Sequence, residues 1–151
     1  MRKSFISVIT ATALACGLGI GTARAADKQA DSLSDRIHAV NDAAKKSGSM
    51  KPAMHSISVE TGVPESQVEA MHKKYSDTGV GGVLISCVMA DETKKAPEYF
   101  MDKHKEGKGW AELAREHHVA VDKLNTRLDH VEAAISHPDG HTKDHKGNWK
   151  K

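Results

Sequence analysis

The sequence has few cysteines and few aromatic residues. It contains 2 Cys in 151 residues, and Phe, Tyr and Trp together make up 4% of the chain. Cys16 lies in an N-terminal segment with the features of a cleaved leader, so Cys87 is the one thiol of the remaining chain. A single thiol excludes an intramolecular disulfide, and with it the disulfide-stapled class of small secreted proteins. The core must therefore be built from Leu, Ile, Val, Met and Ala.

Catalytic signatures are also missing. The sequence contains no nucleophile-elbow motif, no phosphate-binding glycine loop followed by Lys and Ser or Thr, and no His-Glu-x-x-His metal helix. It also lacks the Cys-x-x-Cys-His pattern of haem attachment. These absences favour a protein that is not an enzyme and that needs no cofactor.

The first 25 residues predict a cleavable secretory signal peptide. Arg2 and Lys3 provide a positive start, and an uncharged, mostly apolar stretch follows. Ala23 and Ala25 then place small residues at the −3 and −1 positions that signal peptidase requires. The apolar stretch is short and rich in glycine for a membrane-spanning helix. We predict cleavage after Ala25 and residence in the periplasm or outside the cell.

Two alternatives for this leader stay open. The first is retention of the uncut segment as an N-terminal anchor. The second is a lipoprotein site at Leu14-Ala15-Cys16-Gly17, with Cys16 as the lipid-modified residue. Ala13 stands where such sites usually carry Leu, and cleavage there would leave an apolar stub on the mature chain.

Removal of the leader reverses the sign of the net charge. The whole chain has 22 Lys and Arg against 20 Asp and Glu, a net charge of +2. Arg2, Lys3 and Arg24 belong to the leader and every acidic residue follows it, so the mature chain keeps 19 basic and 20 acidic residues. Nucleic-acid-binding proteins normally carry a positive net charge or a basic face. The mature composition therefore disfavours nucleic acid as a partner.

Apolar periodicity predicts helices at both ends of the mature chain. The first apolar stripe has helical spacing, with Ala26 to Ala30 predicted as a loose leading segment, Ser32 as the N-cap and Ser47-Gly48 as the end. The last helix is predicted from Asp122, as its cap, to His137. The two stripes are Leu33, Ile37, Val40 and Ala44, and Leu124, Leu128, Val131 and Ile135.

An internal repeat fills the region between them. Ile57, Ile85 and Leu113 are spaced 28 residues apart in three similar segments, and a glycine turn precedes each segment. Each segment is followed by a turn and a second predicted helix, over 64–75, 96–105 and 122–137. The first and third units align without gaps, whereas the middle unit needs a shift of a few residues. Pro64 and Pro97 suit first-turn positions of these second helices.

We therefore predict an all-α fold. The mature domain over 26–137 is expected to be a small bundle of about three tandem helix-turn-helix-like hairpins. The β-branched run from Val80 to Met89 leaves a strand as an alternative, but the repeat alignment favours a helix there. From Pro138 the chain is rich in Gly, His, Asp and Lys without an apolar period, which predicts a flexible tail over 138–151 that exposes Trp149.

The segment from Trp110 to Leu124 has the apolar spacing of a DNA-binding helix-turn-helix. In such motifs the second helix enters the major groove with basic and amide side chains at its N-terminal end. Lys123, Asn125 and Arg127 are the candidates here. The leader and the negative mature charge count against DNA, so we interpret the spacing as hairpin packing and keep DNA binding as an alternative.

Three histidines in the tail are candidate metal ligands. His137, His141 and His145 recur every four residues, and Asp139 and Asp144 add oxygen atoms between them. Neutral imidazole suits Zn, Cu or Ni. Because Pro138 and Gly140 oppose a preformed helix, we treat a periplasmic His-rich divalent-metal-binding protein as an alternative function.

Cys87 and Trp110 receive structural interpretations. Cys87 lies in the most apolar stretch of the mature chain, which predicts a buried, inert thiol. An intermolecular disulfide, or a soft metal ligand shared with Met89, are the alternatives. Gly107-Lys108-Gly109-Trp110 resembles a ligand loop, but its place in the repeat predicts a turn that Trp110 anchors against the core.

One segment carries a resemblance to other proteins. The run from Lys103 to Glu116 resembles stretches in small uncharacterised exported bacterial proteins with helix-turn-helix-like repeats. The resemblance covers part of the chain and implies architecture and export, with no activity attached. We therefore predict an exported helical binding or structural module, whose partner is a protein or another envelope component.

Overall fold

The structure is a computed structural model that describes residues 20–137, with side chains from residue 28 onward. This part of the chain forms seven α-helices and one short 3-10 helix and contains no strand, which confirms the all-α prediction. No helix within it is long and apolar enough to cross a membrane. The elements are α1 (Ile20–Lys46), α2 (Lys51–Thr61), α3 (Glu65–Lys74), η1 (Ser76–Thr78), α4 (Gly79–Thr93), α5 (Pro97–Lys105), α6 (Trp110–Glu116) and α7 (Val121–Ser136).

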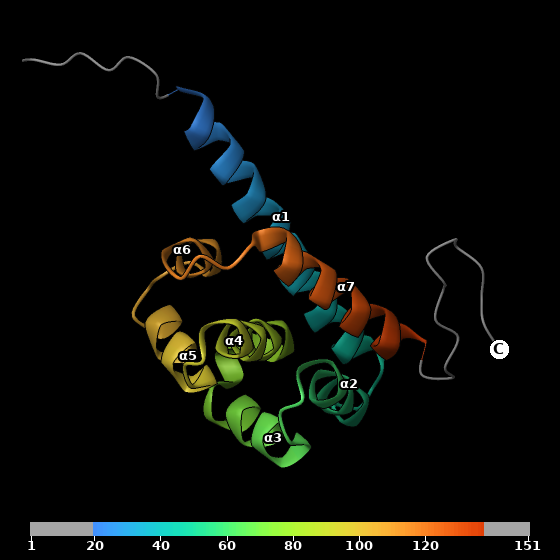
Figure 1. The fold of residues 1–151 in the computed structure, drawn as a ribbon. Coiled ribbons are helices and arrows are strands. Elements are labelled where there is room, and N and C mark those ends of the chain that lie inside the picture. The colour runs from blue at the N-terminus through green and yellow to red at the C-terminus, as the bar shows by residue number, and fades with distance from the viewer. Residues whose placement is uncertain (1–19, 138–151) are drawn as a thin grey trace, which may run out of the picture.

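Helix α4 lies at the centre of the bundle (Figure 1). Every residue from Val80 to Ala90 is buried. The helix contacts α1, α2, α3, α5 and α7, so no side of it faces solvent over this span. A helix that is apolar all round is stable only when it is buried in this way. The strand alternative for this segment is wrong, and the helix favoured by the repeat is confirmed.

Glycine allows α1 to cross α4 at close range. A Cβ atom on Gly81 would lie 2.8 Å from the carbonyl oxygen of Ile37, which is closer than real Cβ contacts. The N–H of Gly81 donates a hydrogen bond of 2.8 Å to Oδ1 of Asn41 on α1. The first turn of α4 is therefore fixed against α1 by both backbone proximity and a polar contact.

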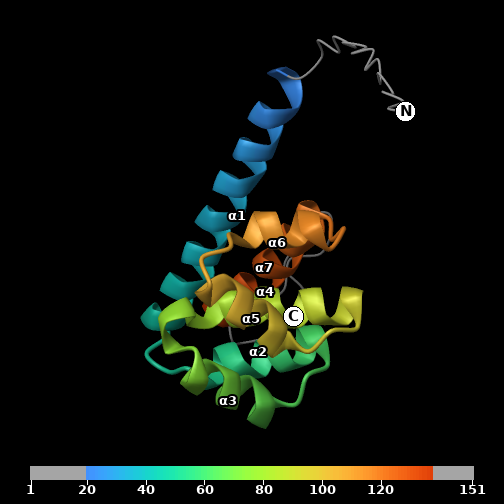
Figure 2. The same ribbon diagram turned by 90° about the vertical axis from the view of Figure 1, so that its left-hand side faces the viewer.

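Helices α1 and α7 lie side by side and run in the same direction (Figure 1). Arg36 on α1 forms an ion pair with Asp129 on α7. All eight residues of the two predicted apolar stripes are buried, as expected. The N-terminal part of α1 projects beyond the rest of the bundle (Figure 2).

Predictions for the helix starts were less accurate. Ala26 to Ala30 is helical rather than loose, and Ser32 lies inside α1 rather than at its N-cap. Asp122 lies in the first turn of α7, while the N-cap is the extended residue Ala120, whose side chain makes no capping hydrogen bond. Pro64 is the N-cap of α3 rather than a first-turn residue. Pro97 begins α5, as predicted.

The same backbone turn joins α2 to α3, α4 to α5 and α6 to α7. The residues that turn the chain have positive φ angles of 72° at Gly62, 59° at Lys94 and 57° at His118. Two residues later an extended residue caps the next helix; these residues are Pro64, Ala96 and Ala120, with ψ angles of 137°, 142° and 124°. The second helices begin and end within one residue of the predicted positions.

Glycines with positive φ stand in the turns before α2 and α6 and at the first residue of α4. Gly48, Gly79 and Gly107 have φ angles of 69°, 72° and 102°. L-residues with a side chain rarely adopt this region, whereas glycine does so at little cost. The three glycine turns predicted from the sequence are therefore present.

Candidate functional site

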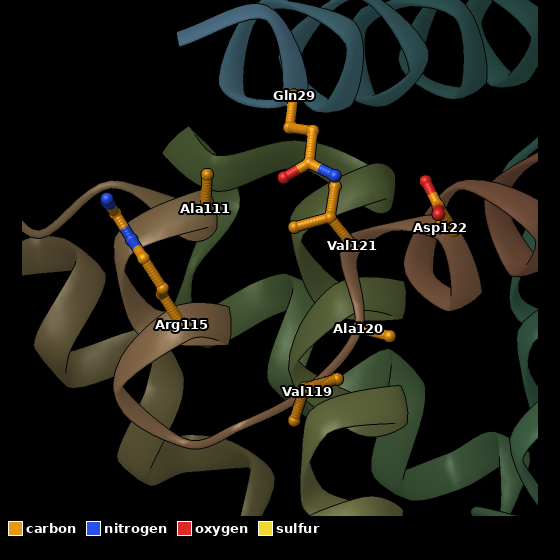
Figure 3. Close-up of a pocket in the computed structure, with 7 residues that line it drawn as sticks. All are labelled: Gln29, Ala111, Arg115, Val119, Ala120, Val121 and Asp122. Atoms are coloured by element: carbon orange, nitrogen blue, oxygen red, sulfur yellow. The ribbon is translucent and has the colours of Figure 1, made fainter. Parts of the chain in front are cut away.

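A pocket of about 230 Å³ lies between α1 and the turn that joins α6 to α7 (Figure 3). The side chain of Gln29 points from α1 toward Val121 across the pocket. Two valines and two alanines supply the apolar part of the wall, and three polar side chains complete it. The lining residues are Gln29, Ala111, Arg115, Val119, Ala120, Val121 and Asp122.

The local fold of α6 explains how this pocket forms. Trp110, Leu113 and Ala114 bury one face of this short helix. At its end the N–H of Val119 donates a hydrogen bond of 2.8 Å to the carbonyl of Ala114, which reverses the chain through the left-handed residue His118. This closure places Val119 at the edge of the core and turns the chain toward α7.

Two charged side chains of the pocket have no partner within the part of the chain that the structure describes. The guanidinium of Arg115 and the carboxylate of Asp122 make no ion pair or hydrogen bond there. They lie on opposite sides of the pocket (Figure 3). By contrast, Arg36 and Arg127 both form ion pairs. Asp122 is favourably placed at the positive N-terminal end of the α7 dipole.

Two of the three side chains that the DNA hypothesis requires form ion pairs within the protein. Lys123 Nζ lies 2.5 Å from Oε1 of Glu92. Arg127 Nη1 lies 2.5 Å from Oε1 of Glu60 and also donates to the Glu60 carbonyl at 3.1 Å. Asn125 Oδ1 is buried and accepts no hydrogen bond from the residues that the structure describes.

Helix α7 itself packs against α1, α2 and α4. A DNA-reading helix needs a face free to enter the major groove. The exposed residues of α7 include Asp122, Thr126 and Ala133, whereas the basic side chains at its N-terminal end are paired with carboxylates of α4 and α2. The geometry therefore fits the hairpin-packing interpretation of the helix-turn-helix spacing better than DNA reading.

Of the three predicted metal ligands, His137 is the one within the described residues. It is exposed at the C-terminal end of α7, and its backbone N–H donates to the carbonyl of Ala133 at 3.0 Å. His141 and His145, with Asp139 and Asp144, lie outside the described residues. Over residues 28–137, no group of three or more His, Cys, Asp or Glu side chains could hold a metal ion.

Cys87 and Trp110 both occupy the buried positions predicted for them. Burial raises the pKa of the Cys87 thiol to about 12, so the thiolate that reacts or binds metal is scarce at neutral pH. The indole of Trp110 is 8% exposed and stacks on the imidazole of His104 with 4.2 Å between the ring centroids. His104 Nδ1 in turn donates to the carbonyl of Lys108 at 2.8 Å. The glycine loop before α6 is therefore closed by contacts within the protein.

Sequence reasoning did not identify the pocket. Gln29 is distant in sequence from the α6–α7 turn, and no spacing pattern links it to Arg115 or Asp122. The one usable signal was the helix-turn-helix spacing, which placed Val119 correctly in the turn. Comparisons of the chain with protein-family models, curated proteins and solved structures found no match.

Proposed function

We propose that the protein is an exported helical module that binds a component of the bacterial envelope and performs no catalysis. The observation that carries the proposal is where the predicted cleavage point falls along α1. Cleavage after Ala25 lies ahead of Leu33, the first buried side chain of the described core. The end of α1 that would be shortened projects beyond the bundle (Figure 2). Removal of the leader therefore leaves every described core contact in place.

We also infer that α2–α3, α4–α5 and α6–α7 are tandem copies of one hairpin. The shared sequence of a glycine turn, a helix, a left-handed residue, an extended cap and a second helix supports this inference. Ile57, Ile85 and Leu113 are fully buried in their respective first helices. Stacked helical hairpins form extended surfaces that other proteins use for binding.

The middle hairpin aligns with the other two only after a shift of a few residues, and the helix lengths explain this shift. Gly62 and Lys94 are 32 residues apart, whereas Lys94 and His118 are 24 apart. Helix α4 has 15 residues and α2 has 11, so the middle unit is longer by about one helical turn. An insertion of one turn keeps the apolar face of a helix in nearly the same direction, which preserves the hairpin.

Fractionation of the native bacterium tests the proposed function. The protein in the envelope or periplasmic fraction is expected to have lost its leader and to migrate in gel filtration as part of a larger complex. Chemical crosslinking before lysis serves as the second measurement of that complex. Recovery from the cytoplasm alone, or a monomer in every native extract, contradicts the proposal.

Metal binding by the tail is a second candidate, favoured by the exposed position of His137 at the end of α7. Calorimetry with Zn, Cu and Ni would compare the mature chain with a version ending at His137. Micromolar binding that disappears on truncation supports it. Absence of binding, or binding that truncation leaves unchanged, rejects it.

A further inference from the structure

The pocket at the α6–α7 turn is the size of a side chain rather than of a cofactor. Its volume of about 230 Å³ is below the ~300–1,000 Å³ of clefts that enclose drug-sized ligands. Val121 lies near the centre of the close-up, with Ala111 to its left, Val119 below it and Gln29 reaching down from α1 (Figure 3). Such a space accommodates one apolar side chain of a larger partner.

The charges on either side of this space are not used within the described part of the protein. Arg115 and Asp122 are both exposed, lie on opposite sides of the pocket and have no partner there (Figure 3). A guanidinium presents a planar fork of donors that suits a carboxylate. A carboxylate such as that of Asp122 complements an ammonium group. The pocket is thus an apolar space with one positive and one negative side.

The first hairpin supplies an internal comparison. His55 and Val59, at the repeat positions of Ala111 and Arg115, line a pocket of about 210 Å³ against α7. Val59 replaces the cation and Ser66 stands at the repeat position of Asp122. The acid that lines this pocket, Glu60, already contacts a cation and an imidazole on α7. The unpaired pair of opposite charges is therefore a property of the third hairpin and does not follow from the repeat.

We propose that the pocket at the α6–α7 turn binds a peptide segment in which one apolar side chain stands between an acidic and a basic residue. The apolar side chain occupies the space beside Val119 and Val121. The acidic residue pairs with Arg115 and the basic residue with Asp122. The inference rests on the proposed binding role and specifies the chemistry of the partner.

Methyl NMR on the purified mature chain tests it with a defined probe. The acetylated, amidated tripeptide Glu-Leu-Lys is titrated at millimolar concentration and compared with Gln-Leu-Gln and Gln-Leu-Lys. Shifts are expected at the methyl groups of Val119 and Val121, while Val59 and Val131 in the other pocket serve as controls. Each exposed ion pair is expected to strengthen binding by about two- to fivefold.

Variants of the two charges separate their roles. Arg115→Gln is expected to abolish the preference for Glu over Gln in the peptide, and Asp122→Asn the preference for Lys over Gln. Lys46→Gln removes an exposed cation at the other end of α1 and is expected to change neither preference. All three side chains are exposed, so the variants are expected to fold, which circular dichroism verifies.

Four outcomes overturn the proposal: no shift at Val119 and Val121, equal binding of the neutral peptide, shifts caused by deleting residues 138–151, and shifts that depend on protein concentration. The third would identify the chain's own tail as the occupant, and the fourth a second copy of the chain. Because the titration uses purified protein, its failure leaves the envelope location standing. Failure of export likewise leaves the peptide result intact.

Discussion

The first and third hairpins have the same backbone turn built from different residues. Ile57 and Leu113 are fully buried at equivalent positions, and so are Val68 and Leu124 in the second helices. The left-handed position, however, is glycine in the first hairpin and His118 in the third. A left-handed conformation costs L-residues about 1–2 kcal/mol. The turn is therefore imposed by the packing on either side of it rather than by the residue that makes it.

A glutamate precedes the turn in both of these hairpins, but the two glutamates make different contacts. Glu60 is 18% exposed and contacts both Arg127 and His130 on α7, so it connects the first hairpin to the third. Glu116, at the equivalent position, is exposed and pairs with Lys108 at 2.5 Å. The two turns thus share a backbone conformation, whereas neighbouring helices determine what the surface side chain before each turn contacts.

The strongest test of this equivalence is truncation of the buried residue in each hairpin. Ile57→Ala and Leu113→Ala are each expected to lower the free energy of unfolding by about 2–5 kcal/mol, because both create a cavity in a close-packed core. Urea denaturation measures both losses. Val59→Ala, at a side chain that is 71% exposed, is the control and should change little. If either substitution leaves the free energy of unfolding nearly unchanged, the two residues do not have equivalent roles in their hairpins.

The two glutamates are expected to differ. Glu60→Gln should cost about 1.5 kcal/mol, since it weakens charge-assisted hydrogen bonds to a half-buried arginine. Glu116→Gln should have no measurable effect on the denaturation midpoint, because its ion pair is exposed to solvent. Equal losses for the two variants would show that Glu60 does not connect the hairpins.

Substitutions at the left-handed positions are expected to have opposite signs. His118→Gly should stabilise the protein by about 0.5–1 kcal/mol, because glycine adopts this conformation without strain. Gly62→Ala should destabilise it by about 1 kcal/mol from backbone strain, although a Cβ there meets no other atom. Thermal unfolding of both variants measures the pair. Destabilisation by His118→Gly would mean that the imidazole itself holds the turn.

The smallest effect concerns pH. The hydrogen bond from Lys108 lowers the pKa of Glu116 below its ordinary value. Since the folded pKa is the lower one, this contribution to stability is present above the ordinary carboxylate pKa and is lost as the pH falls. NMR titration of Lys108→Gln is expected to show the pKa of Glu116 returning upward, while Lys46→Gln leaves it unchanged. If the pKa of Glu116 is unaltered in Lys108→Gln, the ion pair with Lys108 does not lower it.

Much of the fold was predictable because its signals are local. The stripes of α1 and α7, the glycine turns and the buried place of Cys87 all follow from spacing and composition. The starts of two helices were not predictable in this way. Helix α1 continues upstream of Ser32, and the N-cap of α7 is Ala120 rather than Asp122. The segment upstream of Ser32 is rich in the good helix formers Ala, Lys and Gln. The closed α6–α7 turn, rather than a capping side chain, sets where α7 begins.

The candidate site was mostly beyond prediction from one sequence. Glu60 and Arg127 are 67 residues apart, and Gln29 joins Arg115 only because α1 passes over the α6–α7 turn. Such pairs depend on the arrangement of whole helices, which apolar periodicity does not specify. Periodicity identifies the buried face of each helix but not its neighbour.

The intact mass of the native protein tests the central claim most directly. Export with cleavage after Ala25 predicts that protein recovered from the periplasmic or envelope fraction begins at Ala26 and carries no lipid. Recovery of the full chain from Met1 in the cytoplasm would contradict the account. A lipid-modified chain beginning at Cys16 would show instead that the leader is cut at the lipoprotein site and that the lipid anchors the protein in the membrane.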